Sequence, residues 1–191
     1  MLFRSKSIEL GAFWDCKKAK TLSLPAKLDY ISIDAFQNTA IEEVTIPASV
    51  TLVDGMAFAD NRNLKTVRFL GKTKFSTENE QNGYQFSGCE SLEDVVLPDE
   101  TERIEEGMFA SCDSLKEFKF PSKLKTIEDM AFMSSGLTMA SLPTGVTKIG
   151  EAAFEYSQLI EISLPQGLKE IGARAFGSTN LVTAAIPEGI K

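Results

Sequence analysis

The sequence has no histidine among its 191 residues. This absence excludes the commonest general base, a Ser–His catalytic pair and every His-ligated metal site. The three cysteines, Cys16, Cys89 and Cys112, are widely spaced and form no C-x-x-C motif, so no zinc or redox site is predicted. No phosphate-binding, dinucleotide-binding or G-x-S-x-G motif is present. We therefore expect a protein that is not an enzyme and that uses no cofactor or metal.

Long apolar runs are also absent. No stretch approaches the roughly 18 to 20 apolar residues of a membrane span, and Met1–Ile8 contains none long enough for the apolar region of a signal peptide. The net charge of −7 argues against nucleic acid, whose phosphates require clustered lysine and arginine. We expect a protein partner, no nucleic acid, and no membrane insertion of this segment.

What the sequence has in abundance is one repeat, clearest at Leu159–Phe176 as L-x-x-I-x-L-P-x-x-L-x-x-I-x-x-x-A-F. A period of roughly 20 to 29 residues with this leucine spacing is typical of a leucine-rich repeat solenoid. One repeat cannot bury its own apolar face, so neighbouring repeats must stack. The repeat is followed best by its phenylalanine, which occurs in eight registers: Phe13, Phe36, Phe58, Phe86, Phe109, Phe132, Phe154 and Phe176.

The leucine part of each repeat alternates apolar and polar residues, which is typical of a short half-buried strand. In the second repeat, Val44 and Ile46 should point inward and Glu43 outward, and Pro47 should end the strand. We expect about eight repeats of 22–23 residues, with a parallel sheet on one face and short helical or irregular return segments. This predicts a single leucine-rich repeat domain over residues 1–191.

Two features depart from the regular pattern. The chain stops at Pro187–Lys191, partway through a register and without a polar cap, so we expect a fragment of a longer protein. The step from Phe58 to Phe86 is longer than the others because residues 71–85 carry a polar, turn-rich insertion. Such an insertion is either a binding loop or a tolerated surface loop.

A small residue stands three places after each phenylalanine. We expect this column to satisfy backbone groups that the bend turns inward. A disulfide between Cys89 and Cys112 is an alternative, although parallel inward side chains have poor geometry for it. The column reads Cys16, Thr39, Asn61, Cys89, Cys112, Ser135, Ser157 and Thr179.

The outward strand column four places before the proline contains four acidic residues and no basic one. We predict that these four residues, Glu43, Asp94, Glu117 and Glu161, form a negative stripe that binds a basic or polar protein segment; the alternative is a solvated face that keeps a flat sheet soluble. As glycosidase acids, carboxylates on an open face would lack the desolvated pocket that raises one pKa. Trp14 and Tyr156 are either contact residues or packing residues. The candidate binding residues are Glu43, Asp94, Glu117, Glu161, Arg68 and Lys119.

The motif L-x-x-I/V-x-L/I-P-x-x-V/L-x-x-I-G-x-x-A-F, with a small residue three places after the phenylalanine, resembles the BspA-like (Treponema-type) class of leucine-rich repeats. The resemblance covers Ile8 to Ile190. It implies a curved, right-handed solenoid, often on surface proteins, and several members act as adhesins for host matrix proteins or other cells. It therefore implies a non-catalytic, adhesin-like protein-binding module of a cell-surface or secreted protein, whose partner is a host matrix or surface protein. An intracellular interaction scaffold is the alternative, favoured by the missing signal peptide and the unpaired cysteines.

Overall fold

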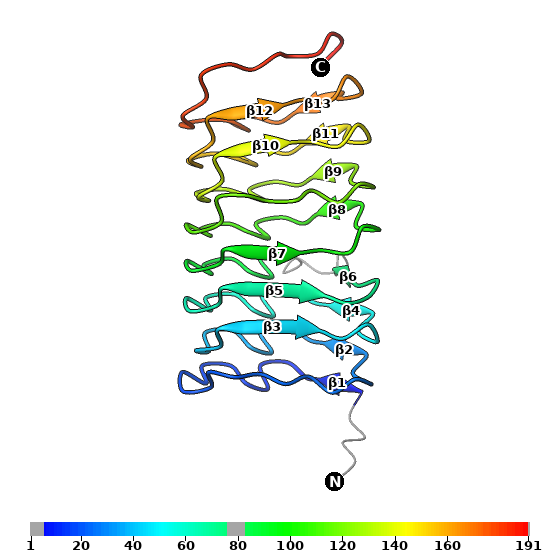
Figure 1. The fold of residues 1–191 in the computed structure, drawn as a ribbon, viewed down its shortest axis with the longest axis vertical. Coiled ribbons are helices and arrows are strands. Elements are labelled where there is room, and N and C mark those ends of the chain that lie inside the picture. Colours follow the sequence, from blue (N-terminus) through cyan, green and yellow to red (C-terminus); the bar gives the residue numbers. More distant parts are fainter. Residues whose placement is uncertain (1–5, 76–82, 191) are drawn as a thin grey trace.

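The chain winds into one elongated stack of turns, shown by a computed structural model that describes residues 6–75 and 83–190 (Figure 1). There are about seven turns, close to the eight registers that the sequence predicts. All strand pairs are parallel, and each pair joins one turn to the next. No helix occurs in the described ranges. The predicted solenoid of stacked parallel strands is confirmed.

One side of the stack carries the longer strands, and we call it the long-strand face. Its strands are β3 (Glu43–Ile46), β5 (Thr66–Phe69) and β7 (Asp94–Val96) in one sheet, and β10 (Met139–Ser141) and β12 (Glu161–Ser163) in another. The predicted alternation is present, since Val44 and Ile46 are buried and Glu43 is exposed.

A second parallel series lies on another side of each turn, and we call it the short-strand face. The sequence analysis missed it because each strand is only two residues long, too short for a period of two to be seen. The strands are β1 (Ser7–Ile8), β2 (Tyr30–Ile31), β4 (Leu52–Val53) and β6 (Lys74–Phe75) in one sheet, and β8 (Arg103–Ile104), β9 (Thr126–Ile127), β11 (Lys148–Ile149) and β13 (Glu170–Ile171) in the other.

The return segments are turns with left-handed backbone at regular places. Around Phe132, Met130 has φ 56° and Ser134 has φ 55°, a region that costs a residue with a Cβ roughly 1–2 kcal/mol. The strained turn lets Phe132 donate its backbone N–H to Ala153 of the next turn at 2.7 Å. Equivalent bonds recur along the stack, so the return side is held by its own backbone ladder.

The phenylalanines of the repeat form a continuous stacked column through the core. Ring centroids of successive residues lie 5.1–5.8 Å apart, with interplanar angles of 3–24°. Each stacked pair contributes roughly 0.5–1.5 kcal/mol beyond the burial of its area. The inner rings are completely buried, whereas Phe13 at the amino-terminal end is 45% exposed.

The predicted polar column is present in the middle of the stack. The Asn61 side-chain amide donates to the Phe36 carbonyl at 2.9 Å and to the Phe58 carbonyl at 2.8 Å. The Cys89 and Cys112 thiols donate at 3.3 Å to the carbonyls of Phe58 and Phe86. These bonds satisfy carbonyls that the turn directs inward.

The column is incomplete at two serines, although Thr179 beyond them donates to the Phe176 carbonyl at 2.9 Å. The buried hydroxyls of Ser135 and Ser157 make no hydrogen bond within the described part of the chain. The alternative disulfide is absent, because Cys89 and Cys112 are both free.

The insertion predicted at residues 71–85 is only partly described. Its first part contributes β6, which pairs with β4, and residues 76–82 lie outside the described residues. After it, the Tyr84 hydroxyl donates to the Glu106 carboxylate at 3.1 Å, which ties this turn to the next.

Replacing Phe132 with alanine should remove one ring from the middle of the column. We expect the free energy of unfolding to fall by about 3–5 kcal/mol, the usual loss for a buried phenylalanine. Chemical denaturation followed by circular dichroism measures it. Phe13→Ala is the matched control and should cost clearly less, because that ring is half exposed. Equal losses at the two positions would contradict the stacked column.

The cysteines predict a simple thiol titration. Burial raises the pKa of Cys89 to about 12 and that of Cys112 well above its usual value. Both should therefore be unreactive in the folded protein, and a chromogenic thiol reagent should detect only Cys16, which is exposed. After denaturation without reductant all three should react; recovery of only one thiol would reveal the disulfide that the structure lacks.

Candidate functional site

The acidic residues predicted to form a stripe lie on the long-strand face in one column. Glu43 pairs in register with Thr66, and Thr66 with Asp94. Further along the stack Met139 pairs with Glu161. All four predicted carboxylates, including Glu117 between β7 and β10, are exposed. These residues are therefore exposed as the strand alternation predicts, and their use in binding remains a prediction.

The structure divides the six candidate residues into three groups. Arg68 and Asp94 form an ion pair of 2.7 Å between β5 and β7; both are half exposed, so the pair stabilises by about 1 kcal/mol at most. Within the described residues, neither Glu117 nor Lys119 has an oppositely charged partner within 4 Å. Glu43 and Glu161 lie in different sheets, near opposite ends of the stack (Figure 1).

The long-strand face is interrupted between β7 and β10, where residues 117–121 form no strand. No backbone hydrogen bond joins residues 117–120 to β7 or to β10. The residue directly after the outward acidic column points inward. In the paired strands it is aliphatic, whereas in this segment it is Phe118. The paired strands have Val44, Val67, Val95, Ala140 and Ile162 at this place.

The Phe118 ring accounts for the interruption. Its centroid lies 5.2 Å from that of Phe109 and 5.1 Å from that of Phe132, so the ring packs against two neighbours of the phenylalanine column. A ring in place of a valine needs more space between successive turns, because interiors are close-packed. The pair Phe109–Phe132 also shows the largest interplanar angle of the column, 24°. The backbone carrying Phe118 consequently does not join the sheet.

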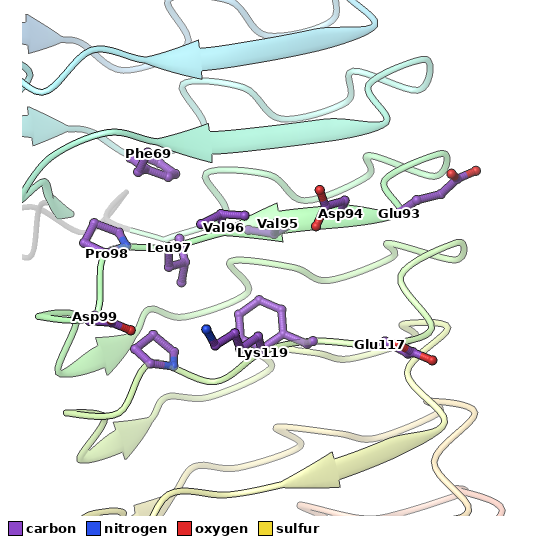
Figure 2. A pocket seen from close by; sticks show the side chains of 12 residues that line it. Phe69, Glu93, Asp94, Val95, Val96, Leu97, Pro98, Asp99, Glu117 and Lys119 are labelled. Atoms are coloured by element: carbon purple, nitrogen blue, oxygen red, sulfur yellow. The ribbon is translucent and has the colours of Figure 1, made fainter.

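A cleft of about 610 Å³ opens at the interruption (Figure 2). Its apolar lining includes Phe69 and Leu97, which are nearly buried, and Phe118. Figure 2 shows Glu93 and Asp94 toward one end of the cleft and Pro98 and Asp99 toward the other. The lining has four carboxylates and one ammonium group: Glu93, Asp94, Asp99, Glu117 and Lys119.

Three of these charged residues, Asp94, Glu117 and Lys119, are predicted from the repeat pattern, but the cleft is not. The available signal was Phe118, an aromatic residue in a column that is otherwise aliphatic. Exposed apolar residues flank the interruption, with Val96 on β7 and Met139 on β10. Trp14 and Tyr156 are also exposed, but they lie in return turns and do not extend the long-strand face.

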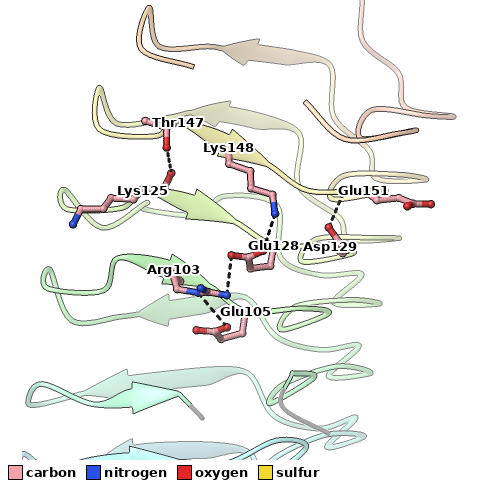
Figure 3. Close-up of polar contacts among 8 residues, drawn as sticks. All are labelled: Arg103, Glu105, Lys125, Glu128, Asp129, Thr147, Lys148 and Glu151. Carbon is pink, nitrogen blue, oxygen red and sulfur yellow. Dashed lines mark hydrogen bonds and ion pairs between the residues drawn. The ribbon is translucent and has the colours of Figure 1, made fainter. Parts of the chain in front are cut away.

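Charged residues on the short-strand face form a ladder of ion pairs across three turns (Figure 3). Arg103 contacts the Glu128 carboxylate at 2.9 Å and that of Glu105 at 3.7 Å, and Lys148 contacts Glu128 at 3.5 Å. Burial raises the pKa of Glu105 to about 7; the Arg103 charge opposes this effect and the Glu128 charge adds to it. Glu105 was not predicted from the repeat pattern, since its burial depends on the two-residue strands that left no periodic signal.

The described residues show little that favours other chemistry. They contain no group of three or more side chains placed to hold a metal ion. No helix that is long and apolar enough to cross a bilayer is found among them.

Comparison with known proteins agrees with the geometry of the stack. The model of the BspA type leucine rich repeat region, with 6 copies, matches residues 3–79 and 79–191. The chain belongs to the BspA-type leucine-rich repeat family. The resemblance drawn from the repeat motif is thereby confirmed, and with it the solenoid. No curated protein sequence gives a significant match.

Solved structures of other leucine-rich repeat proteins have the same fold as this BspA-type chain. A leucine-rich repeat protein from Bacteroides ovatus is 25% identical with a TM-score of 0.68, over 97% of this chain and 59% of that one. The leucine-rich repeat protein of T. pallidum is 29% identical with a TM-score of 0.66, over 77% of this chain and 71% of that one. This chain thus spans 59% of the length of the Bacteroides protein. Leucine-rich repeats of this kind are protein-interaction modules.

The ladder on the short-strand face predicts a pH dependence of stability. The pKa of folded Glu105 is about 7 against a usual 4.5, so folding favours the protonated carboxyl group. Its contribution is fully present below pH 4.5 and is lost as pH rises through 7, by up to roughly 3 kcal/mol. Glu105→Gln should remove this loss, so the variant should be more stable than the parent at pH 8 and similar to it at pH 4.5. Urea unfolding at both pH values measures this; parallel profiles would show that Glu105 ionises normally.

Proposed function

We propose that this chain is a non-catalytic, adhesin-like protein-binding module of a cell-surface or secreted protein, and that its long-strand face contacts the partner. The observation that carries the proposal is the column of four exposed carboxylates at Glu43, Asp94, Glu117 and Glu161, which shares its registers with the uncharged Thr66 and Met139. The family resemblance supports a surface location and a host matrix or surface protein as the partner.

The geometry of the face favours a protein partner over a small molecule. Stacked strands repeat the same outward position about every 4.8 Å, which gives an extended surface rather than an enclosed pocket. The protein carries a net charge of −7, and the column contains four acidic residues and no basic one. Electrostatic complementarity therefore favours a partner with a basic surface, and it should speed association at low salt.

An intracellular interaction scaffold is the second candidate function. It is favoured by the free thiols of Cys16, Cys89 and Cys112, because exported proteins usually pair their cysteines. In this alternative the same face would bind an intracellular protein.

Reversing two charges of the column tests the first proposal. The protein is immobilised and screened by biolayer interferometry against host matrix and surface proteins. For any saturable binder, Glu117→Lys with Glu161→Lys should weaken the affinity at least tenfold, which is about 1.4 kcal/mol, and added salt should weaken the parent complex.

Glu170→Lys is the matched control, because Glu170 is exposed on β13 of the short-strand face. It should leave the affinity within about twofold of the parent. Equal affinity for the parent and the double variant would exclude the column as the contact surface.

A further inference from the structure

The interruption at residues 117–121 separates the two sheets of the long-strand face. The geometry points to the cleft beside β7 as the binding site for an extended segment of the protein partner. In this segment apolar side chains alternate with lysine or arginine. This inference rests on the proposed protein-binding function and specifies where on the face the partner binds and what chemistry it presents.

Unpaired carboxylates give the cleft its charge preference. Arg68 offsets Asp94 at 2.7 Å, but within the described residues Glu93, Asp99 and Glu117 have no cation within 4 Å. These three carboxylates stand against the single ammonium group of Lys119. Like-signed rim charges without partners favour a basic ligand and disfavour an acidic one.

Acidic residues elsewhere in the same turns differ from those of the cleft. Glu100 pairs with Lys123 at 2.7 Å and Glu102 with Lys125 at 2.8 Å. The charges of those two carboxylates are therefore offset by lysine, unlike the charges of Glu93, Asp99 and Glu117 at the cleft.

Apolar residues that line the cleft would contact the apolar side chains of the partner's segment. Phe69 and Leu97 are 6% and 8% exposed and line the cleft with Phe118. Val96 is an apolar residue in an outward column that holds Thr45 in β3 and Arg68 in β5, and it is 42% exposed. An apolar side chain of the partner that packs here would remove both the apolar lining and the Val96 side chain from water.

The backbone beside the cleft supports an extended ligand. Residues 117–120 make no backbone hydrogen bond to either neighbouring turn, unlike their equivalents in β5, which pair on both sides. Backbone N–H and C=O groups require partners, and an extended peptide supplies them when it lies along an unpaired strand. Successive side chains of an extended peptide point to opposite sides. Its apolar side chains would therefore face the apolar lining, and its basic side chains would face the carboxylates at the rim.

Fluorescence polarisation with short blocked peptides tests the inference on the intact protein. The probe is a labelled hexapeptide of alternating leucine and lysine, and the comparison peptides alternate leucine with glutamate and serine with lysine. We expect saturable binding of the leucine–lysine peptide and at least tenfold weaker binding of both comparison peptides. Equal binding of the serine–lysine peptide would overturn the inference, since charge alone would then account for it.

Three variants locate the binding. Glu117→Lys should weaken binding of the leucine–lysine peptide at least tenfold. Glu170→Lys, the control on the short-strand face, should change it less than twofold. Phe118→Val restores the residue type of the neighbouring turns and should close the cleft, so binding should fall at least tenfold while circular dichroism shows the fold retained.

The outcomes separate this inference from the proposed function. If Glu170→Lys weakens peptide binding as much as Glu117→Lys, or if Phe118→Val binds normally, the cleft is not the binding site, although the acidic column remains a candidate contact surface. If no peptide binds while a protein partner still depends on Glu117 and Glu161, the cleft assignment fails and the proposed function stands. If sedimentation shows a dimer that the peptide dissociates, the occupant is a second copy of the chain and the inference is overturned.

Discussion

The stacked phenylalanine column is the interaction on which the rest of the structure depends. Each ring lies 5.1–5.8 Å from the next, and the strands on both faces must keep the spacing of a parallel sheet, about 4.8 Å. The distance between successive turns must therefore suit the ring stacking, the pairing of the strands and the backbone hydrogen bonds of the return turns at once. The left-handed residues on either side of each phenylalanine are the strain that this arrangement tolerates.

That common rise explains why one substitution in the repeat has a large local effect. Phe118 stands where other turns have valine, alanine or isoleucine, and its ring contacts those of Phe109 and Phe132. The phenylalanine column continues past it, but the sheet on the long-strand face does not. The same packing thus preserves the stack and opens a cleft lined with carboxylates on its surface, which joins the architecture of the core to the proposed binding of a basic partner.

Much of the fold could be predicted from the sequence because the repeat supplies the same information several times. The inward Val44 and the outward Glu43 follow from simple alternation, and the inward polar column from the small residues after each phenylalanine. Two-residue strands such as β8 left no periodic pattern to detect, so the buried Glu105 and its raised pKa could not be anticipated. The cleft was missed for another reason. Phenylalanine is a conventional core residue, and only the packing of Phe118 against two other rings indicates that the sheet is interrupted there.

Amide hydrogen exchange along the long-strand face tests the central claim, that Phe118 keeps its segment out of the sheet. The strands β7 and β12 have inter-turn backbone bonds, and residues 117–120 have none. The account predicts slow exchange in both strands and fast exchange of the amides of residues 117–120 between them. Protection of residues 117–120 equal to that of β7 would show that the sheet is continuous, and would contradict both the interruption and the cleft.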